Sequence, residues 1–463
     1  MNTASAITAD FWSALGGEAD VPNALRFTGD GGLPSTFAVT DLASAAIGGA
    51  ALSIAELVRQ RSGVMPGVHV DRRLASFWFR TSIRPIDWRL PAAWNSIAGD
   101  YRTNDGWIRL HTNAPHHRAA AERVLGQHAD KGAVAAAVAR WAKGDLEYAI
   151  VDASGCAAEM RSLGEWRVHP QGRAVAAEPL IHIRATERGP PPAWPVVDTR
   201  PLAGVRVLDL TRVLAGPVAS RFLAGYGAEV LRIDPSEWNE PAVVPEVTLG
   251  KRCARLNLKA VDDRSTFEAL LAEADVLLHG YRPGALASLG WEAAARRATK
   301  PGLVDVCLDA YGWTGPWRER RGFDSLVQMS AGIADAGMRW KNADSPTPLP
   351  AQALDHATGY LLAAAVVRGV FRRLATGEGT EARASLARTA KLLVDRGEGH
   401  DMPPLAPERP ADLMDAIEST SWGDAHRLLP PVSVDGAPMR WTLPATDLGT
   451  AEPRWSHARW RHE

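Results

Sequence analysis

From about residue 200 onward, short apolar runs typical of strands alternate with the apolar periodicity of helices. A continuous apolar run at 205–210 predicts a buried strand. Pro217 then opens a helical pattern that ends at Gly225, because proline favours the first turn of a helix and glycine its end. A second apolar run at 229–233 predicts another strand. Residues 200–234 therefore predict a strand, helix, strand unit of a parallel sheet.

The alternation continues further along the chain, with a helical pattern at 267–273 and strand patterns at 275–278 and 303–308. This order predicts an α/β fold with a doubly wound parallel sheet, a Rossmann-like domain. Ligands of such sheets bind at the carboxyl ends of the strands. The loops expected at that edge are 211–217, 251–259 and 280–284.

The first 195 residues show a different pattern, with short strands and helices between 105 and 183 that predict a smaller α+β domain. The proline-rich stretch 188–195 reads as a linker. Residues 395–428 lack periodicity and predict a long surface excursion. The expected N-terminal region is 1–195, with a helix segment 33–75, a small domain 76–187 and the linker 188–195, and the expected C-terminal region is 196–463.

Two segments of the chain resemble each other. One runs from Asp41 to Gly63 and the other from Asp355 to Gly377, and each is preceded by a Leu-Pro pair. Both contain an alanine-rich apolar stretch between the aspartate and the glycine. We interpret them as a duplicated segment.

Charge and cysteine usage narrow the class of protein. The formal net charge is -1, so no overall field attracts the chain to nucleic acid or to an anionic membrane. No apolar run approaches about 18 residues, and the first ten residues lack an export pattern. The balanced charge therefore favours small-molecule chemistry. The three cysteines are far apart and share no CxxC spacing, which favours a reducing, cytoplasmic setting.

His111, His116 and His117 are the one weak hint of metal chemistry. No acidic or cysteine side chain stands beside them in the sequence, so we interpret them as surface histidines and predict no metal site.

Several motifs, taken together and in order, resemble the family III CoA-transferases, which include formyl-CoA transferase, carnitine CoA-transferase and the α-methylacyl-CoA racemases. The pieces are Pro-Leu-Ala-Gly-Val-Arg-Val-Leu-Asp-Leu-Thr-Arg-Val-Leu-Ala-Gly-Pro (201–217), Gly-Ala-Glu-Val (227–230), Gly-Lys-Arg (250–252), Leu-Asn-Leu-Lys (256–259), Arg-Pro-Gly (282–284), Gly-Phe-Asp-Ser-Leu (322–326) and Asp-His-Ala-Thr-Gly-Tyr (355–360). Family members place their small domain after the catalytic helix, whereas here the similar region comes first. The resemblance therefore implies the family fold with rearranged and partly duplicated halves.

The resemblance also implies a reaction, the movement of CoA from an acyl-CoA thioester to a carboxylic acid through an aspartyl anhydride and an aspartyl-CoA thioester. Asp355 falls on the family's nucleophile. CoA or acyl-CoA would be a substrate rather than a tightly bound cofactor, the second partner would be a small carboxylic acid, and the family's interlocked homodimer is expected. The positions that match the family's CoA-binding residues are Val213, Leu214, Ala215, Leu256, Lys259 and Tyr281.

Asp355 also has a simpler interpretation from its local sequence. It precedes the apolar run 361–371, where an aspartate commonly caps a helix and is held ionised by backbone N–H groups. The resemblance shifts the interpretation to a nucleophile, and Gly359 fits a close approach of substrate to the backbone. Asp41, the counterpart of Asp355 in the other segment, is the rival nucleophile, and we interpret it as a helix cap left from the duplication.

The sequence departs from the family at several positions. Basic or amide residues of the family's CoA site fall on Pro235, Gly280 and Ser288 here, and the expected compensating cations are Arg232, Arg252 and Arg282. The histidine that moves the α-proton in the racemase branch falls on Phe323, so we favour transfer over racemisation.

Two alternatives stay open outside this reaction. A Rossmann dehydrogenase would place a ribose-binding acid at Asp234, but the turn before the first helix lacks the GxGxxG pattern. A non-catalytic family member that binds acyl-CoA or serves in assembly would also explain the departures, because a fold alone does not fix function.

Overall fold

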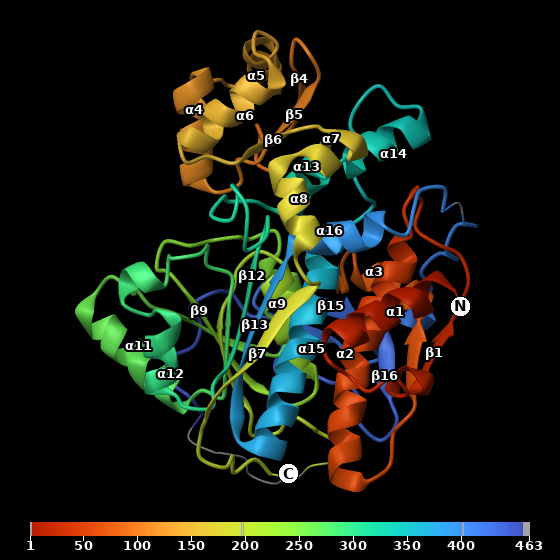
Figure 1. Cartoon of the computed structure of the whole chain (residues 1–463), viewed down its shortest axis with the longest axis vertical. Helices are drawn as coiled ribbons and strands as arrows, with labels where there is room; N and C mark the ends of the chain where they lie inside the picture. Colours follow the sequence, from red (N-terminus) through yellow and green to blue (C-terminus); the bar gives the residue numbers. More distant parts are fainter. Residues whose placement is uncertain (1, 196, 198, 401, 457–463) are drawn as a thin grey trace.

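The structure is a computed structural model that describes residues 2–195, 197, 199–400 and 402–456. It consists of a large α/β body and a smaller domain at one end of that body (Figure 1). Val196, the predicted start of the C-terminal region, lies outside the described residues. The division of the chain at 195 and 196 stays a prediction.

The body is built on a seven-stranded sheet in the order β10-β9-β8-β11-β12-β13-β7. The first six strands are parallel, and β7 is antiparallel to β13 at the edge. The chain winds outward from β8 on one side and then from β11 on the other, which is the doubly wound order of nucleotide-binding folds. The predicted fold class is confirmed. The strands are β7 (Ile181–Arg188), β8 (Arg206–Leu210), β9 (Glu229–Asp234), β10 (Lys251–Arg255), β11 (Val276–His279), β12 (Val304–Asp309) and β13 (Glu378–Ser385).

Helices cover both faces of this sheet (Figure 1). Alternate strand residues supply two separate apolar cores: Val207 and Val276 pack on one side, and Leu208 and Leu277 on the other. Burial of both faces explains why the strands read as continuous apolar runs in the sequence. The first face carries α9 (Ala215–Gly225) and α15 (Ala353–Thr376), and the second carries α11 (Val261–Glu273) and α12 (Ala293–Thr299).

The helices α9 and α15 approach each other closely at Gly359. A Cβ at this position would lie 2.4 Å from the carbonyl oxygen of Ala215. The neighbour that needs a glycine here is therefore the backbone at the start of α9. The expectation that Gly359 makes room for substrate is wrong.

The two similar segments form a pair of helices that pack against each other, α2 (Val39–Ser62) and α15. Each has 24 residues, and each ends at a left-handed glycine with a φ of 76°, Gly63 and Gly377. By length and composition α2 could cross a membrane, but 94% of its most apolar 18-residue window is buried inside the protein. Asp41 and Asp355 are the third residues of these helices.

The smaller domain has an antiparallel sheet in the order β4-β5-β6 and an apolar core of its own, which includes Ile108, Leu146 and Ile150. Its elements are β4 (Gly99–Arg102), β5 (Trp107–Leu110), α4 (Pro115–Leu125), α5 (Lys131–Val138), α6 (Lys143–Asp152) and β6 (Ala157–Glu159). Two short helices, α7 (Leu163–Val168) and α8 (Pro170–Ala177), lead back to the body. The sequence pattern predicted the next strand as a member of the small domain, but β7 instead pairs with β13 and covers the edge of the large sheet.

The two ends of the chain share two small sheets. β1 (Leu25–Thr28), β2 (Val68–Asp71) and β16 (Val432–Val434) form one, and β3 (Ile83–Pro85), β15 (Gly423–Arg427) and β14 (Glu418–Thr420) form the other. The predicted surface excursion over 395–428 is therefore wrong for its last residues, where Ala425 and Arg427 are buried. The sequence pattern did not predict β14, β15 and β16, because these strands have only three to five residues.

The remaining elements are short. They are α1 (Thr3–Ala14), α3 (Arg72–Trp78), α10 (Val244–Val247), α13 (Asp324–Ser330), α14 (Ile333–Lys341), α16 (Leu386–Val394) and three 3-10 helices at Val21–Ala24, Ala287–Leu289 and Pro410–Asp412.

Glu246 joins distant segments of the chain inside the body. Its carboxylate pairs with Arg221 of α9 and with Arg427 of β15, the latter at 3.3 Å. It also accepts hydrogen bonds from the hydroxyl and backbone N–H of Ser82, at 2.7 and 2.9 Å. The two guanidinium groups hold the pKa of Glu246 down at about 2 although burial opposes ionisation.

Candidate active site

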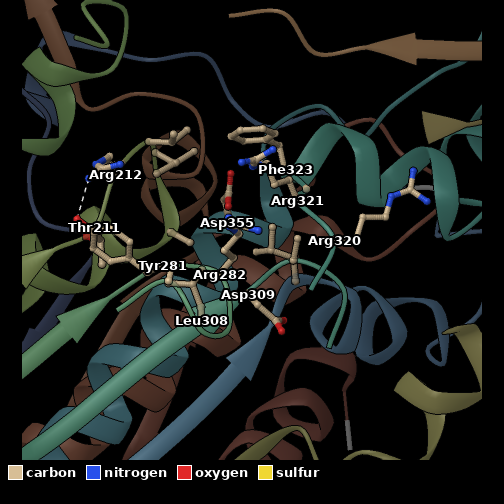
Figure 2. Close-up of a pocket in the computed structure, with 18 of the residues that line it drawn as sticks. Thr211, Arg212, Tyr281, Arg282, Leu308, Asp309, Arg320, Arg321, Phe323 and Asp355 are labelled. Atoms are coloured by element: carbon tan, nitrogen blue, oxygen red, sulfur yellow. Dashed lines mark hydrogen bonds between the residues drawn. The ribbon is translucent and has the colours of Figure 1, made fainter. Parts of the chain in front are cut away.

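A pocket of about 340 Å³ opens at the carboxyl ends of β8, β11 and β12. Its walls are the loops after these strands, the segment before α13 and the first turn of α15. The small domain adds His116 and His117 from α4. Figure 2 shows Asp355 in the middle of the pocket, with Arg212 and Tyr281 on one side and Arg321 and Phe323 on the other. The sequence predicted this edge of the sheet as the place for a ligand.

The loop after β8 has a constrained backbone. Val213 has a φ of 63°, in the left-handed region that β-branched residues avoid. Its N–H donates a hydrogen bond of 2.9 Å to the Glu240 carboxylate, which holds the loop in this shape. Gly216 follows, where a Cβ would lie 2.2 Å from the Thr211 side chain. Strain of this kind collects at functional loops, and this loop lines the pocket.

Asp355 lies in the first turn of α15, and its side chain lines the pocket although the residue is only 8% exposed. It does not cap the helix, because Gln352 holds the N-cap position. Burial and the neighbouring Asp324 carboxyl raise the pKa of Asp355 well above its usual value. The expectation that the helix N-terminus keeps this carboxyl ionised is therefore wrong.

Asp324, the first residue of α13, is the second carboxyl group of the site and is 1% exposed. It accepts a hydrogen bond of 2.9 Å from the backbone N–H of Asp355 and another from the Gln328 amide. Burial raises the pKa of Asp324 to about 6, against these hydrogen bonds. Asp324 thus holds the backbone of Asp355 in place and disfavours its charge.

The predicted CoA-binding residues divide into two groups. Val213, Leu214, Ala215 and Tyr281 line the same pocket as Asp355. Leu256 is buried in the apolar core beneath the sheet, and the Lys259 side chain is exposed to solvent, so neither lines this pocket. The structure therefore brings four of the six together with Asp355.

Comparison with known proteins identifies the region that carries this pocket. Residues 202–401 match the sequence model of CoA-transferase family III. Through these residues, the chain is similar to CoA-transferase family III. The matched range includes the loop after β8, Tyr281, Asp324 and Asp355.

Two curated relatives show the extent of the similarity. An acyl-CoA transferase from Gibberella moniliformis is 30% identical over 330 residues, which are 66% of this chain and 57% of that protein. The succinyl-CoA:glutarate CoA-transferase of Mus musculus is 32% identical over 195 residues, 39% of this chain and 44% of that protein. The chain spans about half the length of the curated relatives it matches.

A solved structure of hypothetical protein Rv3272 from Mycobacterium tuberculosis is 30% identical to the chain. The match covers 42% of this chain and 58% of that one, with a TM-score of 0.38.

Most departures from the family III pattern are not compensated as expected. Arg232 is fully buried and pairs with Asp234 and Glu240, and Arg252 donates to the backbone carbonyl of Arg454. Arg282 is the one expected compensating cation that lines the pocket. A second cation, Arg212, lies over the rings of Trp238 and Tyr281, at 4.9 and 5.1 Å from their centroids. Arg212 and Arg282 thus both line this pocket.

Two other aspartates were candidates for a functional role, Asp234 of the family III region and Asp41 of the N-terminal region. The carboxylates of both pair with arginine side chains. The carboxylate of Asp234 accepts two hydrogen bonds from Arg232, at 2.8 and 3.0 Å, and is fully buried. Asp41 pairs with Arg72 at 2.6 Å and does not line the pocket of Asp355. A ribose cannot reach the first carboxylate, and the second is neutralised by its partner.

The histidines that the sequence predicted as surface residues lie at this site. His111 and His117 are 6% and 4% exposed, so that expectation is wrong for both. His111 stacks on Phe323 with 3.8 Å between ring centroids, and His117 packs against the same ring at 5.7 Å. Only the contact between the small domain and α13 reveals them, because the histidines are about 210 residues from Phe323 in the sequence. Among the described residues, no cluster of three or more metal-ligating side chains is found.

Proposed function

We propose that this protein is a CoA-transferase that moves CoA from an acyl-CoA thioester to a carboxylic acid, with Asp355 as the nucleophile. The observation that carries the proposal is the position of Asp355, in the first turn of a buried helix, where it faces the pocket formed by Val213, Leu214 and Ala215. The family III match over the same residues supports it.

The reaction follows from the chemistry of a carboxylate and a thioester. An Asp355 oxygen attacks the thioester carbonyl, an anhydride forms, and the C–S bond breaks to release CoA thiolate. The thiolate attacks the aspartyl carbonyl, which frees the donor acid and leaves an aspartyl-CoA thioester. The acceptor carboxylate attacks the carbonyl of this thioester, the C–S bond breaks to release CoA thiolate, and a second anhydride forms. The returning thiolate then takes the acceptor's acyl group and regenerates Asp355.

The two sides of the pocket suit the two ends of this substrate. Arg212 and Arg282 supply positive charge for the CoA phosphates, and the ring of Tyr281 offers an apolar face for the adenine. Phe323 lines the pocket at the position where the racemase branch has its histidine, and a phenyl ring cannot transfer the α-proton. Transfer is therefore proposed rather than racemisation. Lys259 lies outside the pocket, and we propose that it binds a phosphate of CoA there.

We also propose that the protein is a homodimer in the cytoplasm.

The test is a screen of acyl-CoA donors against carboxylic acids, read by mass spectrometry, with Asp355→Ala and Asp355→Asn beside the wild type. The relatives are named for succinyl, glutarate and other acyl groups, which sets the first donors and acceptors to try. We expect CoA exchange and a covalent CoA adduct in the wild type, and at least a thousandfold loss of both in the two variants.

Asp41→Ala is the matched control, because it removes the corresponding residue of the duplicated helix, and it should keep the exchange activity. Exchange that survives in Asp355→Ala but disappears in Asp41→Ala would contradict the assignment. Stabilisation by NAD and not by CoA in a thermal-shift comparison would favour the dehydrogenase instead, and CoA binding without any exchange would favour the non-catalytic binding protein.

A further inference from the structure

The small domain contributes a histidine to the wall of the Asp355 pocket. His117 lies in the first turn of α4 and lines the pocket, although it is only 4% exposed. Its ring packs edge-on against Phe323, whose neighbour Asp324 holds the backbone of Asp355. The imidazole is thus fixed in the pocket wall beside Phe323.

The polar atoms of His117 are unsatisfied. Neither ring nitrogen has a hydrogen-bond partner among the described residues, and both are buried. Burial, with His116 and Arg321 nearby, lowers the pKa of His117 to about 3, so the ring is neutral and carries one N–H donor. A buried donor without a partner is costly, and such a group in a pocket wall is satisfied by a ligand oxygen.

Arg321 supplies a cation next to this ring. Its guanidinium donates one hydrogen bond of 2.8 Å to the Ser154 carbonyl, and within the portion of the chain that the structure describes it has no carboxylate partner. The adjacent Arg320 differs, because it pairs with Glu147 at 2.9 Å. Arg321 lines the pocket and lies beside Asp355 in the close-up (Figure 2).

We propose that His117 and Arg321 bind the carboxylate of the acceptor acid, with Arg321 supplying the charge and His117 a hydrogen bond. A guanidinium and a neutral N–H together match a carboxylate, which is planar and accepts at both oxygens. This inference rests on the proposed function, which makes the bound acid the acceptor of CoA. It assigns Arg212 and Arg282 to the phosphates of CoA, and His117 and Arg321 of the same pocket to the acid. The small domain would then select the acid, and the body would bind CoA.

The test measures binding, so it needs no turnover. The full chain is titrated with sodium acetate against sodium chloride of equal ionic strength, and separately with adenosine 3′,5′-bisphosphate, the nucleotide end of CoA, with thermal shift as the readout. We expect saturable acetate binding that His117→Asn and Arg321→Gln each weaken at least tenfold, while the affinity for the bisphosphate changes less than twofold.

Two variants of the same residue types serve as controls. His128→Asn and Arg318→Gln lie outside the pocket and should leave both affinities unchanged. Arg321 is half-buried, so Arg321→Gln decides the matter if His117→Asn fails to fold. Weakened bisphosphate binding with unchanged acetate binding would assign Arg321 to CoA and overturn the inference, as would a wild type that binds no acetate.

Steady-state kinetics separate this inference from the proposed function. In an active enzyme, the two variants should raise the KM for the acceptor acid at least tenfold and leave the KM for the acyl-CoA donor within twofold. Active variants with an unchanged acceptor KM would overturn the inference and leave the proposed function intact. A wild type that binds acetate through these residues but exchanges no CoA would contradict only the proposed function.

Discussion

At the scale of single residues, the site combines Asp355, the proposed nucleophile, with a neighbouring carboxyl group that opposes its negative charge. Asp324 accepts the backbone N–H of Asp355 and is therefore the better stabilised of the two carboxyl groups. Burial and the neighbouring Asp324 carboxyl both disfavour the charged form of Asp355 and raise its pKa. A carboxylate in a largely buried site is a stronger nucleophile once it is ionised, so the arrangement favours reaction although it lowers the ionised fraction.

Asp324→Asn tests this balance. The variant removes a negative charge but keeps an oxygen for the backbone N–H of Asp355, so the pKa of Asp355 should fall. We expect the acid limb of the pH profile of kcat/KM to move to lower pH, because Asp355 then ionises at lower pH. Asp335→Asn, which changes an exposed ion pair with Arg339, should leave the limb in place. A limb that moves to higher pH or stays unchanged would contradict the assigned pair.

The sequence predicts some of this residue pattern. Asp355, Val213, Leu214, Ala215 and Tyr281 are found from motifs, because a motif keeps its spacing along the chain. Motifs do not predict that Asp324 holds the Asp355 backbone or that His117 lies at the site. Each of these depends on contacts between elements far apart in the sequence.

At the scale of elements, the site depends on how closely α15 packs against α9. Gly359 lets the two helices meet, and this contact holds the Asp355 turn against the loop of Val213 and Ala215. The strands β8, β9, β11 and β12 lie within a residue or two of their predicted bounds, since each is a buried apolar run. β10 was not predicted as a strand, because its Lys251 is a charged residue that is buried against Asp209.

Gly359→Ala should disturb both stability and the site. A methyl group 2.4 Å from the Ala215 carbonyl oxygen forces the helices apart, which costs about 1–3 kcal/mol for an overpacked core. We expect this loss in urea denaturation, together with a lower kcat. Gly49→Ala in α2 is the matched control, since its Cβ would meet Phe11 at an ordinary 3.7 Å. That variant should be as stable as the wild type or more so, because alanine favours a helix.

At the scale of the whole molecule, one buried carboxylate connects three distant segments. Glu246 contacts Ser82 from the N-terminal region, Arg221 from the body and Arg427 from the C-terminal strands. Removing its charge would leave the buried guanidinium of Arg221 without its carboxylate partner and would leave Arg427 with Glu418 alone, which is far more costly than removing a surface pair.

Glu246→Gln should therefore lower the free energy of unfolding by about 3–5 kcal/mol at neutral pH. The folded-state pKa of about 2 lies below the usual 4.5, so the carboxylate stabilises the protein above pH 4.5 and loses that effect as the pH falls toward 2. The difference between variant and wild type should shrink over this range in denaturant titrations. Glu319→Gln, whose partner Arg318 is exposed, should change stability by less than about 1 kcal/mol. A difference that stays constant with pH would contradict the role of the charge.

The pairing of β2 with β16 and of β3 with β15 has a consequence for biosynthesis. A ribosome makes the strands near residues 70 and 85 hundreds of residues before their partners near 425 and 433. Until then the nascent chain presents open strand edges, which other chains can join. The N-terminal third should therefore need protection from a chaperone during synthesis, and chains that end early should aggregate rather than fold.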